Sequence, residues 1–209
     1  MLIDISWPLL PGMVMYKNRH PLDIKQIRTI AEHGVADSGC NYLYMHTGTH
    51  VDAPSHFLQD GPSIEQLSLE QMNGLCRVLD LTHVVKDCIL MEDLLPFQIT
   101  SGERILLKTR NSYAPAMGVY GTNEVYMEAS AARFLANIGI ALVGIDALGL
   151  ERNQPGYVSH RSLFAAGVII VEGLRLAEVP VERTEYTLHL LPLAFVGTEA
   201  APARAVLSF

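Results

Sequence analysis

Strand-like and helix-like segments alternate in the middle of the chain, and this alternation limits the possible folds more than any other feature of the sequence. Residues 105–109, "ILLKT", and 141–146, "ALVGID", are short apolar runs of the kind that forms buried strands. Residues 123–139 lie between them and have helical spacing, with Asn123 or Thr122 as the predicted N-cap. The order strand, helix, strand predicts a βαβ unit with two parallel strands.

The same order continues toward the C-terminus. Residues 159–167 are predicted to form a second helix, and residues 168–174, "VIIVEGL", a further buried strand. Runs of β-branched and aromatic residues bounded by Gly, Pro, Asn or Asp predict additional strands at residues 2–6, 41–51 and 76–85 and two within 186–209. Because no linker or repeat separates these segments, we expect a single α/β domain over residues 1–209.

Composition excludes several classes of protein. Hydrophobic residues make up 49% of the chain and charged residues 18%, which favours a compact core over disorder. The formal net charge is −7 and Lys and Arg do not cluster, so the chain lacks the basic surface of a nucleic-acid-binding protein. The N-terminal segment has no basic stretch before an apolar run, and the longest apolar stretch is too short to span a bilayer. We expect a cytoplasmic protein with no nucleic-acid or membrane partner.

The three cysteines, Cys40, Cys76 and Cys88, lie far apart in the sequence. Their odd number argues against a disulfide framework. Since free cysteine packs like a small hydrophobic residue, we expect buried or half-buried thiols.

Residues 46–56, "HTGTHVDAPSH", concentrate metal-ligating side chains. A helix is a poor interpretation, because Gly48 and Pro54 oppose it and Asp52 would point away from the histidines. In a strand, His46, His50 and Asp52 share one face, but a straight strand would hold the two histidine α-carbons about 13 Å apart at roughly 3.3 Å per residue. Ligands of one ion converge to about 2 Å from it, so we expect a bend at Gly48 and an end of the strand at Pro54.

Imidazole and carboxylate ligands together suit zinc, manganese or iron, and without nearby thiols they indicate an open catalytic site. Glu172 is the best further ligand candidate, because an acid at the end of a buried strand is costly unless it meets a cation. His160 opens the preceding predicted helix and should lie near it. Asp146 has two open interpretations, either orienting a ligand or capping a turn.

These residues carry a family resemblance. "HTGTHVDAPSHF", followed by "DGPSIEQLSLEQMNG", resembles the signature of the cyclase-like metal-dependent hydrolases, the family that includes bacterial kynurenine formamidase and isatin hydrolase. "VGID", "SHRSLFAAGVIIVEGL" and "APARAV" are similar to that family in order and spacing, so the resemblance covers nearly the whole chain. It implies a fold of the swivelling β/β/α type, with a β-barrel-like mixed sheet and flanking helices, and a homodimer or homotetramer.

The resemblance also implies roles for individual residues. His46, His50 and Asp52 would bind a first divalent cation, and Asp52 would reach a second. His160 would bind the second cation and Glu172 both. His56 would then be the proton-transfer residue beside the pair. Zinc is the expected metal and manganese the alternative, because members of the family use either.

The implied activity is hydrolysis of an amide, formamide or lactam C–N bond through a metal-activated water. The alternative is a metal-dependent binding protein for a small molecule, with the same ligands and no hydrolysis. Kynurenine formamidases carry a tryptophan that stacks on the aromatic substrate, whereas the corresponding segment here has Tyr16 and Lys17. Tyr16 and Phe57 are the expected substrate contacts, with Met13 and Met15 as further candidates for the pocket.

Overall fold

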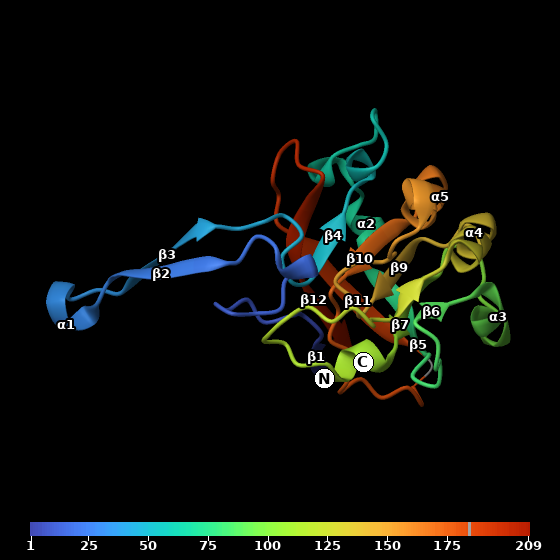
Figure 1. Cartoon of the computed structure of the whole chain (residues 1–209), viewed down its shortest axis with the longest axis horizontal. Helices are drawn as coiled ribbons and strands as arrows, with labels where there is room; N and C mark the ends of the chain where they lie inside the picture. The colour runs from blue at the N-terminus through green and yellow to red at the C-terminus, as the bar shows by residue number, and fades with distance from the viewer. Residues whose placement is uncertain (184) are drawn as a thin grey trace.

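In a computed structural model, which describes residues 1–183 and 185–209, the chain folds around a closed ring of seven strands (Figure 1). The ring runs β12-β11-β5-β7-β9-β10-β4 and closes because β4 also pairs with β12. Its members are β4 (His50–Asp52), β5 (Gly74–Asp80), β7 (Arg104–Lys108), β9 (Leu142–Ile145), β10 (Ile169–Glu172), β11 (Tyr186–Pro192) and β12 (Ala200–Ser208). The short β1 (Leu2–Asp4) extends the sheet at β12. A mixed α/β barrel of this kind confirms the predicted fold class.

Four neighbouring strands of the barrel, β5, β7, β9 and β10, are parallel. The helices α4 (Ala129–Ile138) and α5 (Val158–Ala165) connect the last three of them, so both predicted βαβ units are confirmed. The remaining barrel pairings are antiparallel. The two chain ends lie side by side, and the Met1 amine donates to the Phe209 carbonyl at 2.8 Å.

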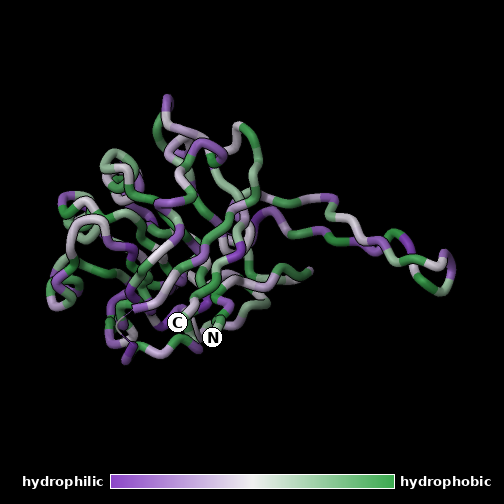
Figure 2. The backbone as a smooth tube through the Cα atoms, turned by 180° about the vertical axis from the view of Figure 1, so that it is seen from behind, coloured by the Kyte–Doolittle hydropathy of each residue, from purple (hydrophilic) through white to green (hydrophobic). Residues whose placement is uncertain are grey.

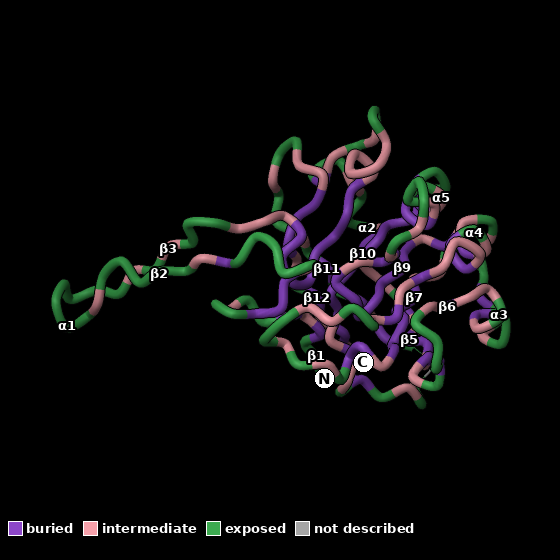
Figure 3. The backbone as a smooth tube through the Cα atoms, in the orientation of Figure 1, coloured by how far each residue is buried: buried purple, intermediate pink, exposed green. Residues whose placement is uncertain are grey.

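Alternate strand residues point to opposite sides of the barrel wall, as the two-residue period of a strand requires. One set, with members from all seven strands, forms a single buried cluster inside the ring, among them Val51, Val78, Leu106 and Leu188. The other set includes Leu107, Val143 and Ile170 and packs outside the ring with apolar residues of α4 and α5. Figure 3 shows the resulting buried strands beneath exposed helix surfaces.

Two predicted boundaries are wrong. The helix expected from residue 123 begins only at Ala129, where the Glu128 side chain accepts a hydrogen bond from the Ser130 amide at 2.7 Å. The residues before it instead form β8 (Tyr126–Met127), which pairs with β6 (Cys88–Ile89). The strand expected over 41–51 is also interrupted, because the chain turns between His46 and His50.

A two-stranded arm, formed by β2 (Asp23–Arg28) and β3 (Asp37–Tyr42) with α1 (Ile30–His33) at its tip, projects from the body (Figure 1). Hydrophobic and hydrophilic residues mix along it (Figure 2), and its apolar side chains are exposed, with Ile27 at 65% and Ile30 at 70%. The two remaining helices, α2 (Leu69–Met72) and α3 (Met91–Leu94), are single turns on the body. Among the described residues, no helix is both long and apolar enough to cross a membrane.

Candidate metal centre

The bend expected at Gly48 brings the histidines of residues 46–56 together. Gly48 has φ +61, a left-handed conformation that glycine adopts without a steric penalty. The rings of His46 and His50 lie 5.0 Å apart between centroids, far closer than a straight strand would allow. Pro54 then starts a 3-10 turn, Pro54–His56, that returns the chain toward the same point, with the His56 ring 4.4 Å from that of His46.

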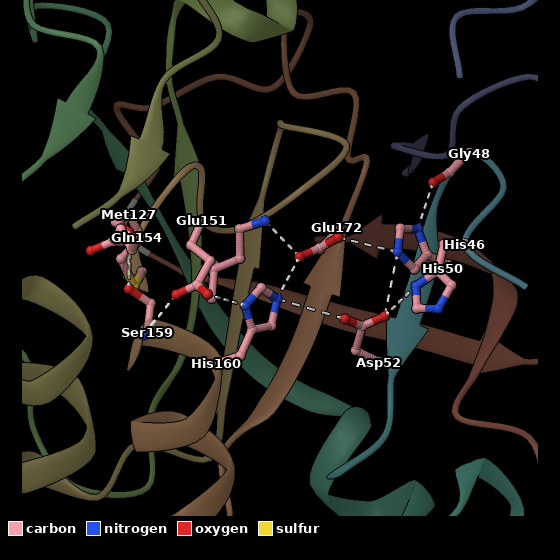
Figure 4. Close-up of polar contacts among 11 residues, drawn as sticks. His46, Gly48, His50, Asp52, Met127, Glu151, Gln154, Ser159, His160 and Glu172 are labelled. Atoms are coloured by element: carbon pink, nitrogen blue, oxygen red, sulfur yellow. Dashed lines mark hydrogen bonds and ion pairs between the residues drawn. The ribbon is translucent and has the colours of Figure 1, made fainter. Parts of the chain in front are cut away.

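Strand pairing supplies the acid from the far end of the chain. β4 and β10 pair antiparallel in a register that places Glu172 opposite His50 and Ile170 opposite Asp52. The α5 helix precedes β10 and presents His160 beside Glu172. All five residues are buried, with side chains at most 8% exposed, and they converge outside the ring where β4 and β10 face α5 (Figure 4): His46, His50, Asp52, His160 and Glu172.

The two carboxylates each face two ways. Asp52 directs Oδ1 toward His46 Nδ1 at 2.9 Å and His50 Nε2 at 3.4 Å, and Oδ2 toward His160 Nε2 at 3.7 Å. Glu172 directs Oε2 toward His50 Nε2 at 3.2 Å and Oε1 toward His160 Nε2 at 3.1 Å. Each carboxylate therefore offers one oxygen to the side of His50 and one to the side of His160.

The donor set fits divalent cations. One atom from each of His50, Asp52 and Glu172 lies within 4.8 Å of the others, and the same holds for His46, Asp52 and His56. His46 Nε2, His50 Nε2 and Asp52 Oδ1 are buried without a well-aligned hydrogen bond, although oppositely charged atoms lie nearby. Buried polar atoms that converge without hydrogen bonding are costly unless a cation is present to accept their lone pairs.

Charge also favours cations. Burial alone would lower the pKa of His46, but the neighbouring Asp52 outweighs it and raises that pKa to about 9. Burial would likewise lower the pKa of His160, but Glu151 and Glu172 outweigh it and raise that pKa to about 10. Burial alone would raise the pKa of Glu172, yet the neighbouring His160 and His50 rings hold it well below its usual range. The centre therefore attracts positive charge strongly.

Contacts behind the centre fix the orientation of its side chains. His50 Nδ1 lies 2.9 Å from the Gly48 carbonyl, which leaves Nε2 for the carboxylates. Glu151 places Oε1 3.5 Å from His160 Nδ1 and accepts the Ser159 amide on Oε2 at 2.7 Å. The Leu150 amide donates to Glu172 Oε1 at 2.5 Å. Such outer contacts select the ring orientation of a metal-binding histidine.

The centre forms the floor of a pocket of about 320 Å³, which is within the range of small-molecule sites. Tyr16 and Phe57 line it, as does His56. Burial lowers the pKa of His56, which favours the neutral ring that can accept a proton. Met13 and Met15 do not line the pocket; they are buried in a separate cluster around Trp7.

Several residues around the centre were not predicted from the sequence. Glu151 is buried although acids rarely are, and its position after the apolar run ending at Leu150 was the available signal. Glu199, whose Oε1 lies 3.3 Å from His46 Nε2, arrives through the β12–β4 pairing and had no local signal. The others are Leu148, which is buried, and exposed or half-buried residues of the pocket wall: Lys17, Arg19, His20, Tyr44, Gly149 and Tyr157.

Of the two interpretations of Asp146, orienting a metal ligand or capping a turn, the structure supports the turn. Asp146 is buried and accepts hydrogen bonds from the Thr109 amide at 2.7 Å and the Ser112 amide at 3.0 Å, away from the centre. Among the cysteines, Cys76 is buried and Cys88 half-buried as expected, but Cys40 is exposed on the arm. The expectation for that third thiol is wrong, because β3 has no layer packed against it.

Comparison with known proteins gives matches over almost the whole chain. The sequence model of the family described as "Putative cyclase" matches residues 3–152. A kynurenine formamidase of Salinibacter ruber is 32% identical over 208 residues, which cover 99% of this chain and 96% of that protein. A solved structure described as a potential metal-dependent hydrolase with cyclase activity is 41% identical, with a TM-score of 0.86 over 99% of this chain and 96% of that one. Isatin hydrolase A of Labrenzia aggregata, at 22% identity and a TM-score of 0.84 over 99% and 93% of the two chains, shares the fold.

Proposed function

This chain belongs to the putative cyclase family, and on that premise we propose that it is a metal-dependent hydrolase that cleaves an amide C–N bond. The relatives named kynurenine formamidase support a formamide substrate, and the solved relative described as a metal-dependent hydrolase supports the use of a metal. The observation that carries the proposal is the pair of buried carboxylates, Asp52 and Glu172, each with its two oxygens facing different histidines.

We propose two divalent cations, zinc or manganese, at this centre. His46, His50 and Asp52 would hold one cation, and His160 the other, with Asp52 and Glu172 reaching both. The cations would supply Lewis acidity, polarising the amide carbonyl and making a water molecule acidic near neutral pH.

His56 has the properties of the proton carrier. Its lowered pKa leaves a ring nitrogen free to accept the proton of the attacking water. As the new C–O bond forms and the C–N bond breaks, the protonated ring returns that proton to the leaving nitrogen. The same geometry would also allow His56 to bind a cation together with His46 and Asp52, so the two roles require an experiment.

Phe57 and Tyr16 give the pocket its apolar walls. The Phe57 ring stacks on His160 at 4.4 Å and meets His56 at 4.2 Å between centroids. This contact covers one side of both histidines and limits the access of bulk water to the reacting groups. Tyr16 presents an aromatic ring in the segment where kynurenine formamidases use tryptophan, which supports an aromatic amide such as N-formylkynurenine as the candidate substrate.

The test combines metal analysis with kinetics. We expect two cations per chain by elemental analysis, hydrolysis of formanilides or lactams by the metal-loaded protein, and loss of that activity with a chelator. His56→Ala should keep both cations and lower kcat by about 10²- to 10⁴-fold. His83→Ala is the matched control, because His83 is exposed and does not line the pocket; this variant should keep both cations and an unchanged kcat.

The outcomes separate the alternatives. Loss of a cation from His56→Ala would make His56 a ligand rather than the proton carrier. A metal-loaded protein that turns over no formamide, lactam or ester would instead favour a small-molecule binding protein. One cation per chain would require a new assignment for His160 and Glu172.

The arm supports the expected homo-oligomer. Two isolated antiparallel strands are marginally stable in water, yet the arm exposes Ile24, Ile27, Ile30 and Val35. We propose that a second copy of the chain covers these residues in a homodimer or homotetramer. Light scattering should give a multiple of 23.0 kDa, and Ile27→Asp should lower it; a monomeric mass for the unaltered chain would refute the proposal.

A further inference from the structure

The outer edge of the pocket carries positive charge. Residues 16–20, "YKNRH", pass across the mouth, and Lys17, Arg19 and His20 line the pocket there. The Lys17 ammonium lies 5.0 Å from the centre of the Tyr16 ring, on the wall of the pocket. Within residues 1–183 and 185–209, neither Lys17 nor Arg19 forms an ion pair, whereas most of the other arginines pair with an acid or bind backbone carbonyls.

A continuous row of rings connects this edge to the candidate metal ligands. The His20 ring lies 4.5 Å from that of Tyr44, Tyr44 lies 5.1 Å from His46, and His46 lies 4.4 Å from His56. His20 is itself held by Tyr42, whose hydroxyl lies 2.9 Å from Nδ1. One tyrosine ring therefore separates His20, which lines this edge, from His46 at the centre, and a pocket of about 320 Å³ suits a molecule with one aromatic ring.

The backbone of this segment is strained at Lys17 and on both sides of Arg19. Lys17, Asn18 and His20 have φ of 53, 55 and 55, left-handed values that side chains with a Cβ rarely adopt. The Asn18 side chain accepts the Tyr120 amide at 2.7 Å, and the Asn18 amide donates to the Met15 carbonyl at 2.8 Å. Strain that surrounding contacts maintain is concentrated at functional sites, because an unconstrained segment would relax.

The charge at the mouth of the pocket is opposite in sign to that of the chain as a whole, since Lys17 and Arg19 lie there and the net charge is −7. Free cations at the mouth of a pocket attract and orient an anion. An anionic group in that position leaves the opposite end of the ligand to face the centre.

We propose that Lys17 and Arg19 bind an anionic group of the substrate, a carboxylate or phosphate carried on the side remote from the scissile amide. This inference rests on the proposed function and specifies the substrate class: an acidic amide with one aromatic ring. Lys17 and Arg19 are specificity residues that hold the anion at the mouth, and they take no part in bond cleavage.

Two substrates of equal shape test the inference: 4-formamidobenzoate, with a carboxylate, and 4-formamidobenzamide, with a neutral amide at the same position. The unaltered protein should have the higher kcat/KM for the carboxylate, mainly through a lower KM, and 0.5 M salt should reduce the difference by screening. Lys17→Gln and Arg19→Gln should each lower the carboxylate-to-carboxamide ratio by about two- to fivefold, the effect of a solvent-exposed ion pair. The double variant should abolish the preference.

Lys86→Gln is the matched control, since Lys86 is exposed and does not line the pocket, and its ratio should equal that of the unaltered protein. Calorimetric binding of 4-aminobenzoate supplies a readout independent of turnover, and the double variant should weaken it. Equal kcat/KM for both substrates, with no response to either substitution, would overturn the inference while leaving the hydrolase intact. Turnover of neither substrate or any other amide would instead overturn the proposed function.

Discussion

Replacing Gly173 with alanine tests whether close backbone packing holds the centre together. Gly173 follows Glu172 at φ +68, and a Cβ there would lie 2.3 Å from the Gly48 carbonyl oxygen and 2.8 Å from its carbon. Both atoms belong to the backbone, so no side chain can move aside. The Gly48 carbonyl is also the group that orients His50, at 2.9 Å from Nδ1. Gly173→Ala should therefore displace a candidate ligand as well as destabilise the fold.

The expected loss follows from two contributions. An L-residue in the left-handed conformation costs roughly 1–2 kcal/mol. Forcing a methyl group into a filled space costs about 1–3 kcal/mol more, which gives roughly 2–5 kcal/mol in total. Gly167 provides the matched control, because it has φ +74 and no atom lies within 4 Å of the place that a methyl group would take, so Gly167→Ala should cost only the first contribution.

The assay is urea denaturation of the metal-loaded proteins, followed by elemental analysis of the same samples. Gly173→Ala should lower the free energy of unfolding by more than Gly167→Ala does and should lose bound cation. Gly167→Ala should retain its full cation content. If the two variants lose equal stability, or if Gly173→Ala keeps its cations and activity, the contact with Gly48 does not support the centre.

Two further predictions concern acids near the pocket. Burial raises the pKa of Glu124 from its usual 4.5 to about 7. Between these two pH values the folded chain keeps a proton on Glu124 that the unfolded chain has released. The free energy of unfolding therefore falls as pH rises from 4.5 through 7. Glu124→Gln should consequently have a larger free energy of unfolding than the unaltered chain at pH 8, by roughly 3 kcal/mol, and this difference should shrink toward pH 5. A difference that does not depend on pH would contradict the assignment. Glu151→Gln should weaken cation affinity by about 10- to 100-fold in chelator competition, because Glu151 orients His160, whereas unchanged affinity would show that the contact is incidental.

The elements whose signal lies in a short run of consecutive residues were predictable. Residues 105–109 and 141–146 form strands because their apolar runs suit burial on both faces, and the helix between them supplies the crossover of a parallel pair. The bend at Gly48 was predictable because the histidine ligands of one ion have to converge. Alternation over 41–51 was misleading, since the spacing of His46, His50 and Asp52 there reflects ligand chemistry and a tight turn rather than a continuous strand.

Long-range pairing was not predictable from local sequence. Closure of the barrel depends on β4 meeting both β10 and β12, across more than a hundred residues. The His50–Glu172 register follows from that closure, as does the approach of Glu199 to His46. The positive charge at the edge of the pocket was not predictable either. In the sequence Lys17 and Arg19 look like ordinary surface residues, and only the structure shows that residues 16–20 line the pocket.

The electrostatics of the centre connect its fold to its proposed chemistry. The pKa of His46 is about 9 and that of His160 about 10, so both rings are protonated at pH 7 when no cation is bound. Their positive charge then balances the negative charge of the buried carboxylates. A cation can bind either ring only after its proton leaves, so uptake at pH 7 should release protons to the buffer. Because proton competition grows as pH falls, affinity should weaken with falling pH throughout the range below 9, and calorimetry in buffers of different ionisation enthalpy measures the protons released. Uptake at pH 7 without proton release would mean that the cations bind elsewhere, since these two rings cannot keep their protons and serve as ligands.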